Sequence, residues 1–196
     1  EIHHSGTLFK ANQIIPAMMR DNLEMAMSSP ASLAEFAPYM SMFTAGYLFT
    51  DYEHMSSVMN SEIGHQFFDR VAEDTGVRPL TSFYLGARQI NLRQPEGVQT
   101  PEDLAGIKLR MPGSEAYMFL GRALGANPTP LAFGEVYMAL KTGTIDGQDN
   151  PLPTVQSAKF YEVTESISLT NHYVSLVTPI ISESLWQEMG PELQGK

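Results

Sequence analysis

Hydrophobic and polar positions along the chain follow two periods, one typical of helices and one typical of strands. Apolar residues recur at helical spacing in residues 61–76, and Gly76 stands at the position of a helix C-cap. The apolar residues predicted to share the buried face are Ile63, Phe67, Phe68 and Val71. Residues 77–92 and 167–182 are rich in apolar and aromatic residues, which is typical of strands.

The clearest start and stop signals lie between residues 100 and 143. Thr100 and the following Pro-Glu-Asp predict a short helix that ends near Gly106, and residues 107–111 predict a strand. Ser114 is a candidate cap for the next helix, and a further helix over 133–142 is closed by Gly143. This alternation of strands and helices predicts an α/β fold with largely parallel sheets.

The ends of this region are less regular. A helix is expected over 11–22, with a helix start or a kink near Pro16, followed by a strand at 23–27. Residues 144–150 are interpreted as a strand that runs into a turn, with Asp146 and Gly147 leaving the strand. An amphipathic helix is predicted over 155–166.

Composition limits the classes of function. The hydrophobic fraction of 43% and charged fraction of 17% are those of a packed globular protein. The net charge of -10, without any basic run, argues against nucleic acid and anionic membranes as partners. A site for an organic acid must therefore supply its own arginines. The absence of cysteine excludes disulfides, thiolate metal sites and a cysteine nucleophile.

Catalysis and metal binding find little support in the motifs. Asp146, Asp149 and Asn150 surround a glycine, but the spacing does not match a calcium loop. Asp146 and Asp149 are also a candidate acid/base pair, although nothing in the sequence indicates a raised pKa. The histidines lack ligand spacing with acids, and no hydrolase, P-loop or dinucleotide motif occurs. We expect no catalytic residue, no metal and no cofactor.

Arginines at strand ends offer a better candidate. Arg88 and Arg110 each follow a run of apolar strand residues, and Asn150 has a comparable position. Ligands in open α/β folds bind beyond the carboxyl ends of strands, where a guanidinium can hold a carboxylate through two hydrogen bonds. The alternative for each arginine is a structural salt bridge or a surface position. Phe133 either walls a pocket or belongs to the core face of its helix.

Several long motifs resemble the substrate-binding proteins of tripartite ATP-independent periplasmic (TRAP) transporters, the DctP family. They include "DLAGIKLRMPGS", "LGANPTPLAFGEVYMALKTGTIDGQDNPLPT" and "KFYEVTESISLTNHYV", and the similarity runs through most of the chain. The resemblance implies an α/β protein of two lobes (a type II-like periplasmic binding protein) that close over an organic acid. Lobe I is expected at 1–85 and 174–196, and lobe II at 86–173. The hinge strands are expected at "FYLGAR" and "HYVSL".

The resemblance also implies roles for individual residues. Arg110 is expected to be the main carboxylate ligand, assisted by Arg88 and Asn150, with Phe133 packed against the bound molecule. Family members are longer at both ends, so we expect this chain to be truncated at both ends. Ser28 and Ser29 are the best remaining candidates in lobe I, with a simple turn and helix cap as the alternative.

The sequence thus predicts a periplasmic, non-enzymatic binding protein, expected to be a monomer, that delivers an organic acid to membrane permease subunits. A sugar acid is favoured over a C4-dicarboxylate or a keto acid, by resemblance alone. Two alternatives stay open. One is an α/β enzyme acting on a hydroxy or keto acid through Asp146 and Asp149, and the other is a structural interaction domain without a pocket.

Overall fold

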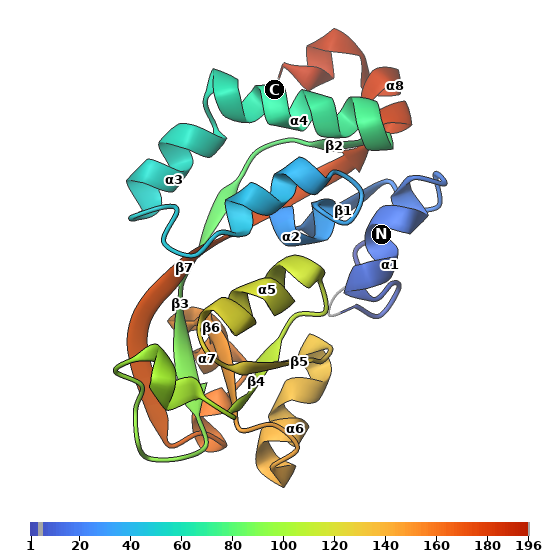
Figure 1. Cartoon of the computed structure of the whole chain (residues 1–196). Helices are drawn as coiled ribbons and strands as arrows, with labels where there is room; N and C mark the ends of the chain where they lie inside the picture. The colour runs from blue at the N-terminus through green and yellow to red at the C-terminus, as the bar shows by residue number, and fades with distance from the viewer. Residues whose placement is uncertain (4–5, 196) are drawn as a thin grey trace. The chain divides into compact units, whose positions relative to one another are not determined.

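The computed structural model describes residues 1–3 and 6–195 (Figure 1), and the chain divides into two compact units. Unit 1 contains Glu1–Phe43, Glu53–Tyr84 and Leu176–Lys196, and unit 2 contains Thr44–Tyr52 and Leu85–Ser175. Two long strands, β3 (Phe83–Leu92) and β7 (Ser166–Ser182), have residues in both units, since the unit boundaries fall inside them. No helix of the described residues is long and apolar enough to cross a membrane.

Unit 1 is built on the C-terminal part of β7. Strands β1 (Met25–Ser28) and β2 (Val77–Pro79) both pair with it in antiparallel orientation. The helices in or bordering this unit are α1 (Ala11–Met18), α2 (Pro30–Leu33), η1 (Pro38–Thr44), α3 (Tyr52–Met59), α4 (Glu62–Thr75) and α8 (Glu183–Gln194).

Helix α4 forms where the sequence predicts a helix. The Ser61 hydroxyl caps its first turn, and Gly76 ends it in the left-handed conformation with φ of 70°. The helix lies along β2 (Figure 1), with Phe68 and Val71 buried. The prediction for Ile63 is wrong, since its side chain is 62% exposed. The buried face begins instead at Gly64, where the end of α3 approaches so closely that a Cβ would lie 2.1 Å from the Met59 carbonyl oxygen.

Pro16 lies inside the N-terminal helix, which excludes one of the two predictions made for it, a helix start. Helix α1 begins at Ala11 and runs through Pro16 to Met18, so a helix start at the proline is wrong. Proline in a helix loses only its own backbone donor and crowds the preceding turn, and burial of Ile15, Ala17 and Met18 offsets that cost.

Unit 2 contains a mixed sheet with strand order β7-β3-β6-β4-β5. The strands not yet given are β4 (Lys108–Met111), β5 (Asn127–Pro130) and β6 (Gly147–Pro151). Strand β4 is parallel to β5 and β6, but β3 is antiparallel to β6, and β1 and β2 are antiparallel to β7. The prediction of largely parallel sheets is therefore wrong. The parallel pairs β4–β5 and β4–β6 lie within the stretch β4-α5-β5-α6-β6, where helical crossovers join the strands.

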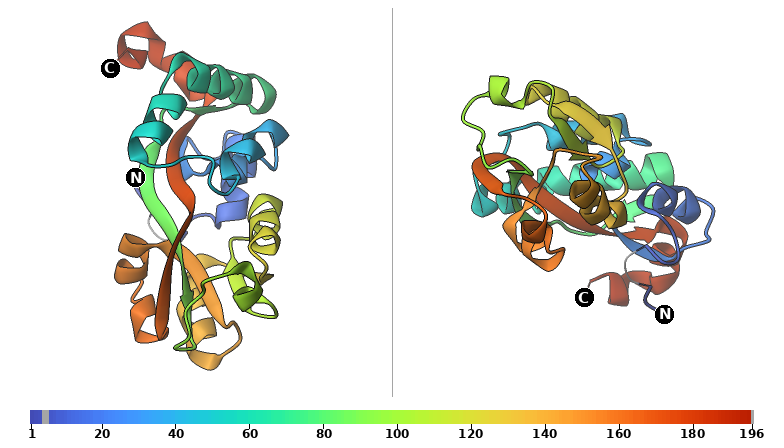
Figure 2. Two further views of the ribbon diagram at one scale, coloured as in Figure 1. Left: turned by 60° about the vertical axis from the view of Figure 1, so that its left-hand side comes forward. Right: turned by 90° about the horizontal axis from the view of Figure 1, so that it is seen from below.

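Short helices cover the sheet of unit 2. They are η2 (Pro101–Leu104), α5 (Glu115–Ala123), η3 (Phe133–Glu135), α6 (Val136–Thr142), α7 (Leu152–Ser157) and η4 (Phe160–Glu162). Helices α5 and α7 lie on opposite faces of the sheet (Figure 2, left). The helix predicted over 155–166 is wrong in extent, because α7 starts at Leu152 and the chain turns at Lys159, where φ is 57°.

The largest difference from the predicted elements lies at the polar stretch that ends in Pro151. Residues 147–151 form strand β6, and all five residues are buried. The interpretation of Asp146 and Gly147 as a turn leaving a strand is wrong, because they precede and begin one. Strand β6 pairs with β3 on one side and β4 on the other, so its backbone N–H and C=O groups find hydrogen-bond partners. The polar sequence alone does not indicate this pairing.

Gly86 makes the close approach of β3 to β6 possible. Its φ is 128°, and a Cβ there would lie 2.6 Å from the Cβ of Pro151. We expect Gly86→Ala to lower the free energy of unfolding by about 1–3 kcal/mol, from backbone strain and overpacking. Chemical denaturation checks this, with Gly134→Ala as control, because no atom lies within 4 Å of a Cβ at Gly134. Equal stability of the two variants would contradict the prediction.

Candidate functional site

Arg88 lies in the middle of β3 and not at its end, so the expectation that the strand stops there is wrong. Its Nε donates to Asp149 Oδ2 at 2.6 Å, and its Nη2 donates to Asp149 Oδ1 at 3.0 Å. Both side chains are buried. His172 Nε2 lies 3.2 Å from the same Oδ2, and its Nδ1 lies 2.8 Å from Thr170 Oγ1. Arg88 therefore belongs to a buried polar network in which Asp149 binds both Arg88 and His172.

The electrostatics of this pair favour the charged forms. Burial by itself would lower the pKa of Arg88, but the Asp149 carboxylate outweighs burial and raises that pKa. Burial would likewise raise the pKa of Asp149, and the attraction of Arg88 lowers it well below its usual range. The Arg88 Cζ also lies 5.2 Å from the ring centre of Tyr117. Arg88 thus has a full counter-ion before any ligand arrives.

Arg110 has a different environment. It is the penultimate residue of β4 and 3% exposed, and its Nε and Nη2 donate to the carbonyl oxygen of Leu131 at 2.9 and 2.6 Å. No ion pair joins it to an acidic residue in the described part of the chain. Burial, and then the charge of Arg88, lower the pKa of Arg110 to about 10. It remains a cation at neutral pH, and the negative charge of an incoming anion would raise its pKa again.

Asn150 and Phe133 lie on elements next to these arginines. Asn150 follows Asp149 in β6, is 5% exposed, and its Nδ2 donates to Gln148 Oε1 at 2.6 Å. Phe133 begins η3, two residues after the carbonyl that holds Arg110. Its ring is 50% exposed and meets Phe160 edge-on at 5.7 Å between centroids. The buried face of the adjoining helix is formed by others, namely Val136 and Leu140.

The two serines predicted as ligands are in unit 1. Ser28 ends β1, where it is the register partner of Thr178. Ser29 is the N-cap of α2, and its Oγ accepts from the Ser32 backbone N–H at 3.3 Å. The hydroxyl of Ser29 therefore has a local role of the kind that a helix cap supplies.

The carboxylates proposed for catalysis do not form a pair. Asp146 accepts from the backbone N–H of Lys108 at 2.9 Å, whereas Asp149 is fully buried against Arg88 and His172. The alternative of an acid/base pair at Asp146 and Asp149 is accordingly wrong. Over the residues that the structure describes, no group of three or more potential ligands is placed to hold a metal ion.

Sequence reasoning missed the partners of the predicted residues. His172 and Gln148 are both fully buried, and neither was singled out. One available signal was the polar run Gln148-Asp149-Asn150, between Gly147 and Pro151. Amide and acid side chains that bond to one another suit a buried strand as well as a turn. His172 gives no such signal, because it stands inside an apolar strand pattern.

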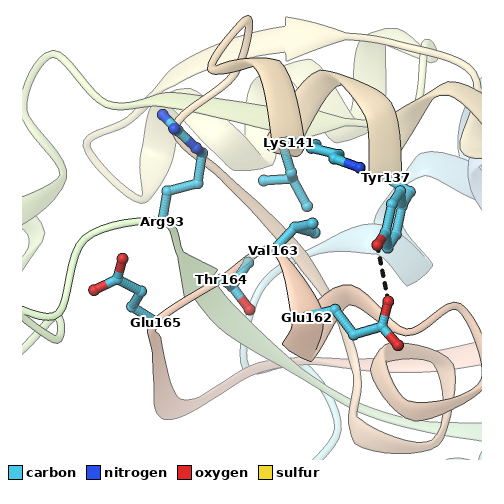
Figure 3. A pocket seen from close by; sticks show the side chains of 8 residues that line it. Arg93, Tyr137, Lys141, Glu162, Val163, Thr164 and Glu165 are labelled. Carbon is cyan, nitrogen blue, oxygen red and sulfur yellow. Dashed lines mark hydrogen bonds between the residues drawn. The ribbon is translucent and has the colours of Figure 1, made fainter.

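A separate pocket of about 500 Å³ lies elsewhere in unit 2 (Figure 3). Its lining is Arg93, Tyr137, Leu140, Lys141, Glu162, Val163, Thr164 and Glu165. Tyr137 donates its hydroxyl hydrogen to Glu162 Oε2 at 2.8 Å across this pocket. None of the predicted ligand residues lines it, and the lining contains two cationic and two acidic side chains. With balanced charges, the pocket has no net preference for an acid.

Comparison with known proteins gives the family context. The profile of the family described as "Bacterial extracellular solute-binding protein, family 7" matches residues 1–196. The chain is 38% identical over 143 residues to the sialic acid-binding periplasmic protein SiaP of Vibrio cholerae, covering 73% of the chain and 44% of that protein. It is 34% identical over 190 residues to the 2,3-diketo-L-gulonate-binding periplasmic protein YiaO of Escherichia coli, covering 96% and 57%.

A solved structure has the same fold. It is a TRAP periplasmic solute-binding protein of Roseobacter denitrificans with bound 3-deoxy-D-manno-oct-2-ulosonic acid. The TM-score is 0.95 at 46% sequence identity, covering 98% of this chain and 64% of that one. The chain therefore spans between about two fifths and two thirds of the length of these proteins.

Proposed function

The chain belongs to family 7 of the bacterial extracellular solute-binding proteins, the DctP family of TRAP transporters, and from this premise we propose that it binds a sugar acid through its carboxylate. Members of this family are binding proteins and not enzymes. The single observation that carries the proposal is Arg110, a buried guanidinium held by a neutral carbonyl and without an acidic partner in the described ion pairs. A buried charge without a counter-ion is costly, and an anionic ligand supplies that counter-ion.

The binding step follows from the two arginine environments. Arg110 forms the charge-assisted hydrogen bonds to the ligand carboxylate, because its charge is uncompensated. Arg88, whose charge is already paired with Asp149, contributes its remaining N–H donors. Asp149 holds it rigidly, so little conformational entropy is lost when the ligand binds. Asn150 adds an amide hydrogen bond, and the exposed ring of Phe133 packs on the carbon skeleton.

Three points support a sugar acid as the ligand class. The relatives named above bind sialic acid and diketogulonate, and the solved structure holds a deoxy-octulosonic acid. All three ligands join a carboxylate to a hydroxylated or keto-bearing chain. The buried amides that surround Asn150 offer further donors and acceptors suited to hydroxyl groups.

The biological setting is part of the same proposal. The protein acts in the periplasm and passes its ligand to membrane permease subunits, as members of this transporter class do. The lobe boundaries at 1–85 with 174–196 and at 86–173, the hinge strands, the monomeric state, and ligand roles for Ser28 and Ser29 remain predictions.

A thermal-shift series tests this function. The probes are 3-deoxy-D-manno-oct-2-ulosonic acid, N-acetylneuraminic acid and D-galacturonate, with methyl D-galacturonate as the matched neutral ester. At a ligand concentration about 100 times Kd, binding stabilises the folded state by about 2.7 kcal/mol, which raises Tm by several degrees. We expect at least one acid to do so and the ester to have no effect. Stabilisation by none of a wider panel of sugar acids, or equal stabilisation by acid and ester, would refute carboxylate recognition.

A further inference from the structure

Four buried amide side chains stand opposite one another on β3 and β6. Gln89 is the register partner of Asn150, and Asn91 is the register partner of Gln148. Opposed residues of an antiparallel pair project to the same face, with Cβ atoms about 4.5–5.5 Å apart. Each of the four is at most 5% exposed. This amide ladder includes Asn150, the residue proposed above to contact the ligand.

The orientation of the Asn150 amide depends on Gln148. Asn150 Nδ2 donates to Gln148 Oε1 at 2.6 Å. An amide has a donor side and an acceptor side, so this bond decides which groups of Asn150 remain for the ligand. If Gln148 rotated its amide by a half-turn, its nitrogen would face Asn150, and Asn150 would have to turn as well. Gln148 can fix Asn150 only when its own amide is fixed.

Asn91 is placed to fix Gln148. Its Nδ2 donates to the Gln89 carbonyl oxygen at 3.1 Å, which leaves its Oδ1 as an acceptor. Asn91 Oδ1 and Gln148 Nε2 are both buried without a hydrogen-bond partner in the described structure. One is an acceptor and the other a donor, on directly opposed residues. A buried donor or acceptor that is left unpaired is unfavourable, so pairing of these two atoms would stabilise the structure.

We infer that Asn91, Gln148 and Asn150 form an orienting relay, in which Asn91 Oδ1 accepts from Gln148 Nε2, directly or through one water. Gln148 then presents Oε1 to Asn150, and Asn150 keeps its second N–H and its Oδ1 for the acid. Gln148 and Asn91 are thus positioning residues that act on the ligand through Asn150. The role in binding rests on the proposed function, whereas the orientation itself does not.

A double-mutant cycle tests the binding role. Kd for 3-deoxy-D-manno-oct-2-ulosonic acid is measured by calorimetry for the wild type, Gln148→Met, Asn150→Ala and the double variant. We expect Gln148→Met to weaken binding about three- to tenfold, the worth of one hydrogen bond, in the wild-type background. In the Asn150→Ala background, the same change should alter Kd by less than twofold. Equal effects in both backgrounds would overturn the relay.

Gln89→Met is the matched control, because it removes a buried amide of the same sheet that bonds to Asn171 and not to Gln148. Its effect on Kd should be the same with and without Asn150. If the effect on Kd depended on Asn150 for Gln89→Met but not for Gln148→Met, the assignment would be contradicted.

A ligand-free measurement keeps the two proposals separable. In the wild type, the two side-chain amide protons of Asn150 should give well-separated, slowly exchanging NMR signals. Both Gln148→Met and Asn91→Leu should move these signals towards those of a solvated asparagine. Unchanged signals in Asn91→Leu would refute the relay even if acids bind. Altered signals in a protein that binds none of the acids would support the relay and refute the proposed function.

Discussion

Replacing Asp149 with asparagine is expected to lower the free energy of unfolding by about 3–5 kcal/mol. The substitution conserves shape and removes one charge. It leaves Arg88, 3% exposed, without its counter-ion, and it places an amide where two charge-assisted hydrogen bonds were accepted. His172 loses a charged acceptor at the same time. Urea denaturation followed by circular dichroism measures the loss.

An exposed ion pair provides the matched control. Glu115 pairs with Arg122, but the two side chains are 82% and 51% exposed. Glu115→Gln should cost less than about 1 kcal/mol, because solvent screens such a pair. The double variant Arg88→Met/Asp149→Leu should recover most of the loss, since removing both buried charges removes the unpaired one. If Asp149→Asn costs no more than Glu115→Gln, the buried pair does not stabilise the fold as described.

The sign of the pH dependence follows from the direction of the pKa shift. The pKa of Asp149 is lower in the folded protein than the ordinary value of about 3.9. The stability that its charged form confers is therefore present above that value and is lost as the pH falls towards the lowered pKa. Between pH 5 and pH 3, the wild type should lose more unfolding free energy than Asp149→Asn. Parallel losses in the two proteins would contradict this assignment.

Replacing Arg110 with methionine is expected to weaken binding of a sugar acid by about 2–5 kcal/mol, which is about 30-fold to several thousand-fold in Kd. The ligand carboxylate would be buried opposite an apolar side chain, without its main donor. Calorimetry with 3-deoxy-D-manno-oct-2-ulosonic acid measures the change. Arg110→Lys should give an intermediate loss, because an ammonium keeps the charge but not the planar pair of donors.

In the ligand-free protein, we expect Arg110→Met to affect stability in the opposite direction to Asp149→Asn. Arg110 has no acidic partner in the described ion pairs, so Arg110→Met removes an uncompensated buried charge and should leave Tm unchanged or raised. Arg122→Met, at an exposed arginine, should change neither Tm nor Kd appreciably. Unaltered Kd in Arg110→Met would refute the proposed clamp, and a large fall in Tm would show that Arg110 is structural.

Local signals in the sequence located several elements correctly. Gly76 ends α4, and Ser114 caps α5, as predicted. Gly143 ends α6 with φ of 76°. These predictions succeed because a cap or a left-handed glycine depends on residues within one turn. Strand β7 was also predicted, because its long apolar and β-branched run permits few other structures.

The candidate site was predictable in part. The motif resemblance pointed to Arg110 as the main ligand, assisted by Arg88 and Asn150, with Phe133 beside them, but it did not indicate that Arg88 already has an acidic partner. The difference between the two arginines depends on Asp149, which is 61 residues from Arg88 in the chain. No periodicity or spacing rule reports a contact over that separation.

The sequence by itself determined the helix caps, the strand-forming segments, the family and the residue types able to hold a carboxylate. Only the tertiary structure decided that Gly147–Pro151 is a buried strand and not a turn, and that Arg88 is neutralised while Arg110 is not. The physical reason is that polar residues carry no local preference strong enough to fix their environment. Their burial, charge state and hydrogen bonds are set by the strands that pair beside them.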